Sequence, residues 1–297
     1  MEGIGDRGQM TPANVKNKIK IFLDLIKFEH TIFALPFAYL GMLLASPDHF
    51  SFKVFFWVTV AMASARTAAM LLNRLIDKQI DAKNPRTQNR ATVTGEFSSG
   101  AALIGIAISL VIFFMSAFLL NPLCFKLSFV AIVLLTGYHY VKRFSFLCHY
   151  ALGLVLASAP MGGWIAVTGR FDVLPVFLSL AVLFWVAGFD ILYSLQDIDF
   201  DRAHGLYSIP VKFGQGSALA ISRYSHLTMV FFLAVFGLFA KLGILYWSGV
   251  AVCGIFLAIE HLFIADGDLT HINTAFFTIN GWVGILLLVF TFLEVFK

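Results

Sequence analysis

Two acidic stretches of this sequence hold residues whose types and spacing could do chemistry. Each lies at the end of a long apolar segment, and each contains two aspartates that are four positions apart. The pairs are Asp77 with Asp81 and Asp197 with Asp201. On a helix this spacing places both carboxylates of a pair on one face, one turn apart, where like charges repel. Two such pairs at matching places in one chain therefore indicate a cation between them.

Oxygen atoms are the only strong metal ligands in these stretches, because neither 73–81 nor 193–201 contains His or Cys. Oxygen donors suit Mg²⁺, a hard ion that keeps several waters and completes its shell with substrate phosphates. Four aspartates, which we also expect to be catalytic, and one asparagine are the expected metal ligands. They are Asn73, Asp77, Asp81, Asp197 and Asp201. The alternative is that these acids flank loops and pair with neighbouring bases such as Lys78, Lys83 and Arg202.

Basic side chains follow both acidic stretches and also end the fourth apolar segment. Carboxylates that hold magnesium beside several Arg and Lys side chains match a diphosphate group. The expected diphosphate ligands are Arg86, Arg90, Lys142 and Arg202. Arg86 and Arg90 lie in the compact segment PRTQNR, and Arg can bind phosphate through two nitrogens at once. The alternative for any single base is that it only fixes the orientation of the chain in a membrane.

The composition is that of a membrane protein that crosses the bilayer several times. Of the 297 residues, 59% are hydrophobic and only 13% are charged, whereas soluble domains carry charge at about a quarter of their positions. The net charge of +4 does not indicate nucleic-acid binding, because the bases are spread over several short loops. Cys124, Cys148 and Cys253 are far apart and form no metal or disulfide pattern.

The chain is expected to consist of a polar tail at 1–20 and a single transmembrane domain at 21–297. The tail lacks the apolar centre of a signal peptide, so we expect no removed segment. Val15–Phe28 alternates Lys with apolar residues and predicts an amphipathic helix at the membrane interface. Nine apolar runs follow. They are 31–45, 55–76, 101–120, 123–141, 146–167, 173–195, 227–240, 244–264 and 275–296. The sequence thus predicts an all-α, multi-pass protein of about nine transmembrane helices.

The acidic stretches end the second and the sixth apolar run, and this matching placement suggests an internal duplication. We expect two parallel four-helix repeats plus one helix around a central cavity, with both acidic stretches at one membrane face. Most Lys and Arg lie on that side, and the five on the other are Lys53, Lys126, Arg170, Lys241 and Lys297. The positive-inside rule then places the N-terminus and the active-site loops in the cytoplasm, most naturally at a bacterial cytoplasmic membrane. Loop 265–271 is an exception, since it lacks Lys and Arg.

The segment NRLIDKQIDAKNPRTQNR at Asn73–Arg90 resembles the first signature of the UbiA superfamily of intramembrane prenyltransferases, NDxxDxxxD, and DIDFD resembles the second, DxxxD. Tyr138–Arg143 resembles the YxxxK element of the same family. The resemblance covers the chain from about Lys20 and is closest to 4-hydroxybenzoate and other quinone-biosynthesis polyprenyltransferases. Arg74 departs from the pattern, because the family motif has its first aspartate there. Arg74 either contacts the diphosphate or points away as a positive anchor.

The resemblance implies Mg²⁺-dependent transfer of a polyprenyl group from its diphosphate to an aromatic acceptor, such as 4-hydroxybenzoate or a naphthoate-type ring, in ubiquinone or menaquinone biosynthesis. Magnesium with Arg and Lys would offset the charge that grows on the leaving diphosphate. A dry, aromatic-lined cavity would protect the allylic cation from water. The expected acceptor ligands are Arg143, Tyr193 and Asp190. Arg66, within the second run, either has a function or pairs with Asp190.

Two other classes of membrane protein remain open on the sequence. One is a transporter that uses intramembrane acids, which duplicated repeats also fit. The other is a non-catalytic binder or flippase of isoprenoid diphosphates. Transporters usually place such acids near the membrane midplane, whereas the acids of this chain end their apolar runs, which favours the enzyme.

Overall fold

The computed structural model describes residues 21–23, 25, 31–45, 51–264, 269–270, 272 and 274–297. The polar tail, most of the amphipathic helix predicted for Val15–Phe28 and most of loop 265–271 lie outside these residues, although Ile21–Leu23 and Leu25 are helical. Every regular element in the described part of the chain is a helix, which confirms the all-α prediction.

Long apolar helices make up the bundle. They are α2 (Thr31–Ala45), α3 (Phe52–Ile76), α6 (Ser99–Leu120), α7 (Pro122–Val141), α8 (Cys148–Thr168), α9 (Leu174–Ser194), α12 (Gln215–Phe239), α13 (Ile244–Phe263) and α14 (Asn280–Val295), the last extended by a π-helical turn, η4 (Thr274–Ile279). Within the described residues, eight helices are long and apolar enough to cross a membrane. This confirms the multi-pass prediction, whereas the predicted count of nine depends on α2, which is only 15 residues long.

Helix α12 is longer than the apolar run 227–240 that predicted it. It begins at Gln215, directly after Gly214, whose φ of 80° lies in the left-handed region that glycine adopts without strain. The first turns of α12 contain Ser, Gln, Arg and Tyr, so they are helical without being apolar. A search for apolar runs therefore misses them.

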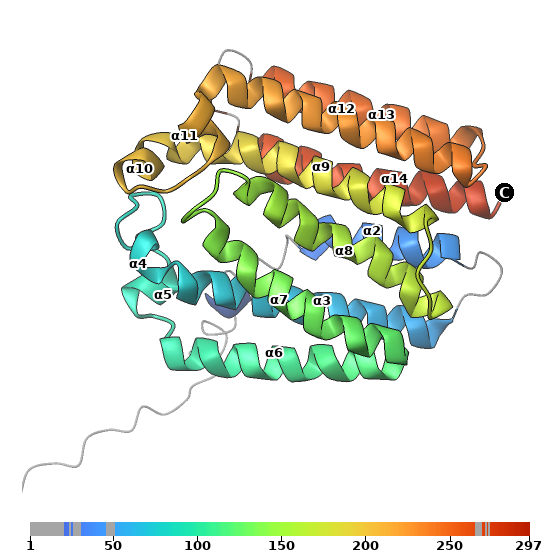
Figure 1. Ribbon diagram of the computed structural model, residues 1–297, viewed down its shortest axis with the longest axis horizontal. Coiled ribbons are helices and arrows are strands. Elements are labelled where there is room, and N and C mark those ends of the chain that lie inside the picture. The colour runs from blue at the N-terminus through green and yellow to red at the C-terminus, as the bar shows by residue number, and fades with distance from the viewer. Residues whose placement is uncertain are drawn as a thin grey trace, which may run out of the picture.

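The connections at one end of the bundle fold into short helices, which Figure 1 shows together on its left side. They are α4 (Lys78–Asp81), α5 (Ala91–Thr94), η2 (Leu195–Asp197), α10 (Ile198–Ala203) and α11 (Ile209–Phe213). Helix α4 follows α3, and η2 with α10 follows α9. Both acidic stretches therefore lie at the same end of the bundle, as the sequence predicts.

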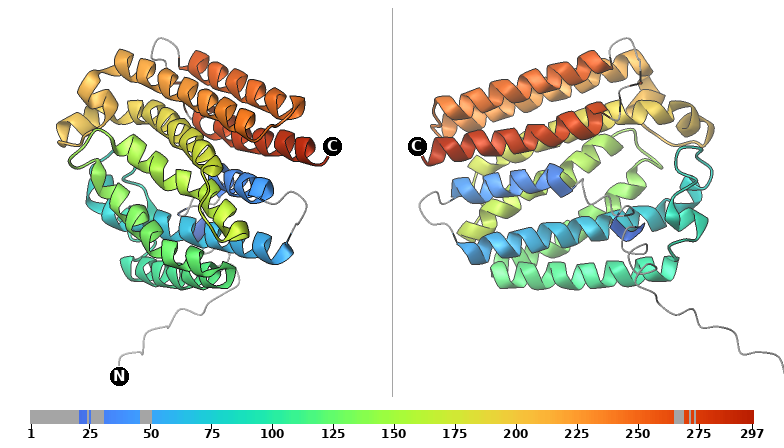
Figure 2. Two further views of the ribbon diagram at one scale, coloured as in Figure 1. Left: turned by 45° about the vertical axis from the view of Figure 1, so that its right-hand side comes forward. Right: turned by 180° about the vertical axis from the view of Figure 1, so that it is seen from behind.

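Two pairs of helices repeat the same arrangement. Helix α3 packs along α6, and α9 packs along α12. In both pairs the two helices are joined through an acidic stretch followed by short helices. Figure 2 shows the first pair on one side of the bundle and the second pair on the other. This correspondence supports the predicted duplication of four helices, with α14 as the added one.

Helix α2 lies unusually close to α8 because both helices have glycine at the contact. A Cβ atom on Gly41 would lie 2.0 Å from the carbonyl oxygen of Pro160, and a Cβ atom on Gly163 would lie 2.0 Å from that of Ala38. Small residues permit such close packing of membrane helices. The contact fixes two of the helices that surround the central cavity.

Candidate active site

Both acidic stretches break their helices at the first aspartate. Asp77 ends α3 with φ −95° and ψ 3°, and Asp197 ends η2 with φ −107° and ψ 6°. This sparsely populated backbone region is frequent in active sites. The helix is thus interrupted at the first aspartate of each pair, a bend that the four-residue spacing does not predict. The backbone N–H of Asp81 still donates to the carbonyl oxygen of Asp77 at 2.8 Å, so these two residues keep a helical spacing. The matching angles give the two stretches equivalent local structures.

Asp77 is buried and receives several hydrogen bonds. Lys142 Nζ lies 2.7 Å from its Oδ2 atom, Asn73 Nδ2 lies 3.0 Å from the same atom, and Arg143 Nη2 lies 3.4 Å from Oδ1. Lys142 and Arg143 come from the end of α7, so this carboxylate joins the ends of α3 and α7. Asn73 Nδ2 also lies 3.2 Å from Nδ1 of His139.

Asp81 has a different basic partner from Asp77. Arg90 Nη1 donates to its Oδ2 atom at 2.6 Å, and Thr87 Oγ1 donates to its backbone oxygen at 3.1 Å. These contacts fold the segment after α4 back over the end of α3. Two of the expected diphosphate ligands, Arg90 and Lys142, thus lie beside the aspartates of the first stretch.

Arg86 connects the two acidic stretches directly. Its Nε and Nη2 atoms donate to the two carboxylate oxygens of Asp197 at 3.0 and 2.5 Å. Burial lowers the pKa of Arg86, but the hydrogen bond and the charge of Asp197 raise it by more, so the pKa lies above its usual value. Asn84 Nδ2 adds a hydrogen bond of 3.0 Å to Asp197. We did not single out Asn84 from the sequence, where its only signal is its place between the acids and PRTQNR.

Two further side chains complete the second stretch. Tyr193 accepts a hydrogen bond of 3.3 Å from Arg86 Nη1, and the guanidinium also lies 5.4 Å from the centre of the tyrosine ring. Asp201 is close enough to Asp197 and Lys142 for their charges to interact. Among the described residues no side chain donates a hydrogen bond to Asp201. Asp199, by contrast, is exposed.

Several predicted bases lie elsewhere. Arg74 is buried and donates to the backbone oxygen of Leu25 and to Oδ1 of Asn73, each at 3.4 Å. Lys78 donates to Ser99 Oγ at 3.0 Å. Arg202 is exposed and makes no ion pair with any residue that the structure describes. The alternative in which Lys78 and Arg202 neutralise the acids therefore finds no support in these contacts.

Asp190, an expected acceptor ligand, is paired with His149. His149 Nδ1 lies 2.7 Å from Asp190 Oδ2, and the backbone N–H of Ile209 donates to His149 Nε2 at 3.3 Å. This geometry places the ring proton on Nδ1, where it faces the carboxylate. No motif in the sequence singles out His149, since its spacing to other histidines matches no metal site.

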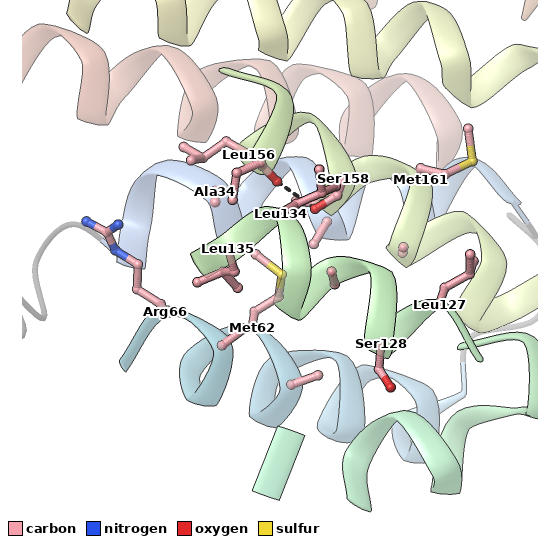
Figure 3. A pocket seen from close by; sticks show the side chains of 18 of the residues that line it. Ala34, Met62, Arg66, Leu127, Ser128, Leu134, Leu135, Leu156, Ser158 and Met161 are labelled. Carbon is pink, nitrogen blue, oxygen red and sulfur yellow. Dashed lines mark hydrogen bonds between the residues drawn. The ribbon is translucent and has the colours of Figure 1, made fainter. Parts of the chain in front are cut away.

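An apolar cavity of about 360 Å³ lies inside the bundle. Its walls come mainly from α3, α7 and α8 and are mostly aliphatic, so aromatic side chains form only part of the lining that the sequence predicts to be aromatic. Arg66 lies at one end, with Leu127 and Met161 toward the other (Figure 3). Tyr138 lines the cavity and lies within electrostatic range of Arg66, Asp77 and Asp190. The cavity therefore extends from the acidic end of the bundle into its interior.

Phe276 joins the cavity to the second acidic stretch. It lines the cavity, and its ring centre lies 4.2 Å from that of Tyr193. Tyr193 in turn contacts Arg86. A ligand with a long apolar part and a charged head could thus occupy the cavity and reach Arg86.

No three His, Cys, Asp or Glu side chains in the described part of the chain converge closely enough to hold a metal ion alone. Mg²⁺ is commonly held by one or two carboxylates together with water and substrate phosphates. Asp197 and Asp201 are near enough to repel each other, and Asp201 has no basic partner donating to it within the described residues. The site can accept a cation at this point.

A sequence model of the UbiA prenyltransferase family matches residues 34–282. The 4-hydroxybenzoate octaprenyltransferase of Shewanella piezotolerans is 29% identical over 287 residues, which cover 93% of this chain and 96% of that enzyme. The enzyme of the same name from Francisella tularensis subsp. novicida is 27% identical over 258 residues, which cover 86% and 89%.

Solved structures of the same family have this fold. The apo structure of a UbiA homologue from Aeropyrum pernix K1 is 34% identical, with a TM-score of 0.82 over 90% of this chain and 98% of the other. A UbiA homologue from Archaeoglobus fulgidus, bound to DMAPP and Mg²⁺, is 20% identical, with a TM-score of 0.73 over 92% and 98%. The second likeness concerns the fold alone.

Proposed function

Because this chain belongs to the UbiA prenyltransferase family, we propose that it transfers a polyprenyl group from polyprenyl diphosphate to an aromatic carboxylic acid. The observation that carries the proposal is the pairing of Arg86 with Asp197, which joins the two acidic stretches and contacts the apolar cavity through Tyr193 and Phe276. The acceptor that we favour is 4-hydroxybenzoate, because that acid is in the names of the curated relatives. The reaction would then belong to ubiquinone-type quinone biosynthesis.

The head of the donor would bind where the acids and bases alternate. We assign Asn73, Asp77, Asp81, Asp197 and Asp201 to Mg²⁺, and Arg86, Arg90 and Lys142 to the diphosphate. When bound, Mg²⁺ would offset negative charge on the leaving diphosphate. Each of these three bases already contacts a carboxylate within 3.0 Å. Phosphate oxygens can replace carboxylate oxygens at the same nitrogens, because both groups offer negatively charged oxygens that accept hydrogen bonds from Arg and Lys.

The prenyl tail would lie in the cavity. Its aliphatic lining offers few hydrogen-bond partners to water, so an allylic cation formed at its polar end would be protected from hydrolysis. Tyr138, Phe189 and Phe276 are among the aromatic side chains that line it. Their ring faces can stabilise positive charge on the allylic carbon.

The acceptor would bind between Arg66 and Asp190. Arg143, the acceptor ligand expected from the sequence, donates to the backbone oxygen of Ile76 at 2.7 Å and to Asp77. Arg66 instead faces the cavity, so we assign the acceptor carboxylate to it. Asp190 could then take the proton that the ring carbon releases once the new carbon–carbon bond has formed, because its side chain is 26% exposed and His149 fixes its orientation.

The expected location is a bacterial cytoplasmic membrane, with the N-terminus and the acidic stretches on the cytoplasmic side. The bias of Lys and Arg toward the acidic end supports this orientation. A water-soluble acceptor could reach the acidic end from that side, while the prenyl donor would enter from the bilayer.

The proposal is tested by incubating membranes that contain the protein with radiolabelled polyprenyl diphosphate, 4-hydroxybenzoate and Mg²⁺. We expect a prenylated acid that forms with Mg²⁺ and does not form with EDTA. Movement of unmodified lipid diphosphate across the bilayer, without product, would support the transporter or flippase alternative. Product formation that EDTA leaves unchanged would contradict the metal assignment.

A further inference from the structure

A buried polar cluster links four helices outside the site described above. Its members are Trp185 in α9, His226 in α12, Glu260 in α13 and Asn280 at the start of α14, and none is more than 3% exposed. A carboxylate among apolar membrane helices is costly, so a buried Glu indicates a function. No step of the proposed reaction uses Glu260.

Asn280 is the centre of this cluster, because its amide has a partner on both sides. Its Nδ2 atom donates to Glu260 Oε1 at 2.6 Å, and its Oδ1 atom accepts from Trp185 Nε1 at 2.7 Å. His226 Nδ1 lies 3.7 Å from the other oxygen of Glu260. A Cβ atom on Gly188 would lie 2.3 Å from the His226 ring, so this ring packs directly against α9. The cluster therefore fixes the start of α14 relative to α9 and α13.

The residues before Asn280 form a π-helix, η4. A π-helical turn is uncommon and occurs frequently at functional sites. Its wider turn changes the direction of the side chains it carries. Here it carries Phe276, whose ring centre lies 5.2 Å from that of Phe189 and 4.2 Å from that of Tyr193.

Phe276 therefore separates the cavity from the charged part of the site. It lines the cavity on one side and contacts Tyr193 on the other. Tyr193 accepts a hydrogen bond from Arg86, which holds both oxygens of Asp197. A continuous series of contacts thus runs from Glu260, through Asn280 and η4, to the place where we assign the diphosphate.

We propose that Glu260 is a positioning residue for prenyl transfer: its hydrogen bond to Asn280 holds η4 in the π-helical form and so keeps Phe276 against Tyr193. Without this acceptor, the amide of Asn280 loses one fixed partner, and the turn can relax toward an ordinary α-helix. Phe276 then turns away from Tyr193, and water reaches the polar end of the cavity. The inference rests on the proposed function, because it assumes that the allylic group reacts at that end.

The readout is the fate of the allylic group, measured as the ratio of free prenyl alcohol to prenylated acid. Glu260→Ala should raise this ratio about tenfold, since a lost buried hydrogen bond of this kind shifts an equilibrium by roughly that factor. Glu260→Gln keeps an oxygen that can accept from Asn280, so it should retain the wild-type ratio. Phe276→Ala should raise the ratio as much as Glu260→Ala does. The variant with both substitutions should show the same ratio as either single variant.

Thr291→Val is the matched control. Thr291 is fully buried in the same helix, α14, and its Oγ1 atom donates to the backbone oxygen of Leu287 at 2.6 Å. Its replacement should lower the melting temperature without changing the ratio. Trp185→Phe removes the other fixed partner of Asn280 and keeps a large ring, so it should raise the ratio even where Glu260→Ala fails to fold.

The inference is overturned if Glu260→Ala and Trp185→Phe both keep the wild-type ratio, or if Glu260→Gln behaves like Glu260→Ala. A wild-type protein that prenylates no aromatic acid would overturn the proposed function instead. The positioning role would then be measured as the affinity for a non-hydrolysable prenyl diphosphate analogue. Glu260→Ala should weaken that affinity and Glu260→Gln should not, and equal affinities of both variants and wild type would contradict the role.

Discussion

Arg86 and Asp197 lie 111 positions apart in the chain, yet the guanidinium of one binds both carboxylate oxygens of the other, at 3.0 and 2.5 Å. This pair joins the loop after α3 to the end of α9. It therefore brings the α3–α6 pair and the α9–α12 pair of helices together at the place where we assign the diphosphate.

Arg86→Lys tests whether this two-nitrogen geometry matters. Lys keeps the positive charge but offers a single point of contact, so kcat/KM for the prenyl diphosphate should fall about 10- to 100-fold, as expected for a lost charge-assisted hydrogen bond. Steady-state kinetics with the donor varied would measure it. Lys83→Arg is the control, because Lys83 lies in the same loop but, unlike Arg86, forms no ion pair with any residue that the structure describes. Wild-type kinetics in Arg86→Lys would remove Arg86 from the diphosphate site.

Asp77→Ala and Asp197→Ala should each lower activity by at least about 100-fold, the usual effect of removing one preorganised electrostatic group. The protein should still insert into the membrane. Removal of Asp77 leaves two bases, Lys142 and Arg143, without their carboxylate partner. Their side chains are 32% and 38% exposed, so water can hydrate them. Product formation and the amount of protein in the membrane fraction should be measured together.

Asp199→Ala provides the comparison for those two variants. Asp199 lies two positions from Asp197 but is exposed, so its loss should leave activity within about twofold, as for most surface substitutions. Full activity in Asp77→Ala or Asp197→Ala would remove that residue from the proposed metal site. A large loss in Asp199→Ala would show that acidic charge near the site matters more than position.

Metal removal should abolish transfer reversibly. EDTA should stop product formation, and added Mg²⁺ should restore it, because oxygen ligands without His or Cys favour hard cations. Zn²⁺ at the same free concentration should restore much less, since it prefers nitrogen and sulfur ligands. Equal recovery with Zn²⁺ would contradict the assigned ligand set.

Cys124→Trp should limit the length of the prenyl chain. Cys124 lies near the start of α7 and lines the cavity, far along the helix from Lys142 at its other end. A large ring there should leave the use of geranyl diphosphate unchanged and lower the use of octaprenyl diphosphate about tenfold or more, because overpacking a cavity costs about 1–3 kcal/mol. Val133→Trp, on the exposed side of α7, is the control. Equal loss for both donors would argue that the tail lies elsewhere.

The sequence predicts the helices and the acidic residues well because their signals are local. Apolar runs identify the long helices, and four-residue spacing identifies the two aspartate pairs. The bend at Asp77 and Asp197 is not predicted, because four-residue spacing is equally compatible with a continuous helix. The partners of each acid are also not predicted, since they depend on which loop folds over which helix end.

The residues that the sequence analysis missed are tied to tertiary contacts. Asn84 matters because its loop reaches Asp197, and His149 matters because α8 places it beside Asp190. Glu260 and Asn280 lie in different apolar helices with no motif between them. Their hydrogen bond follows only from the packing of α13 against α14.

The most direct test of the central claim is a structure of the protein with Mg²⁺ and a non-hydrolysable prenyl thiodiphosphate. The account predicts that the diphosphate lies between the two acidic helix ends, with Arg86 in hydrogen-bonding distance and the prenyl tail in the cavity beside Phe276. A diphosphate bound at the opposite end of the bundle, or held by one acidic stretch with the other far from it, would contradict the account.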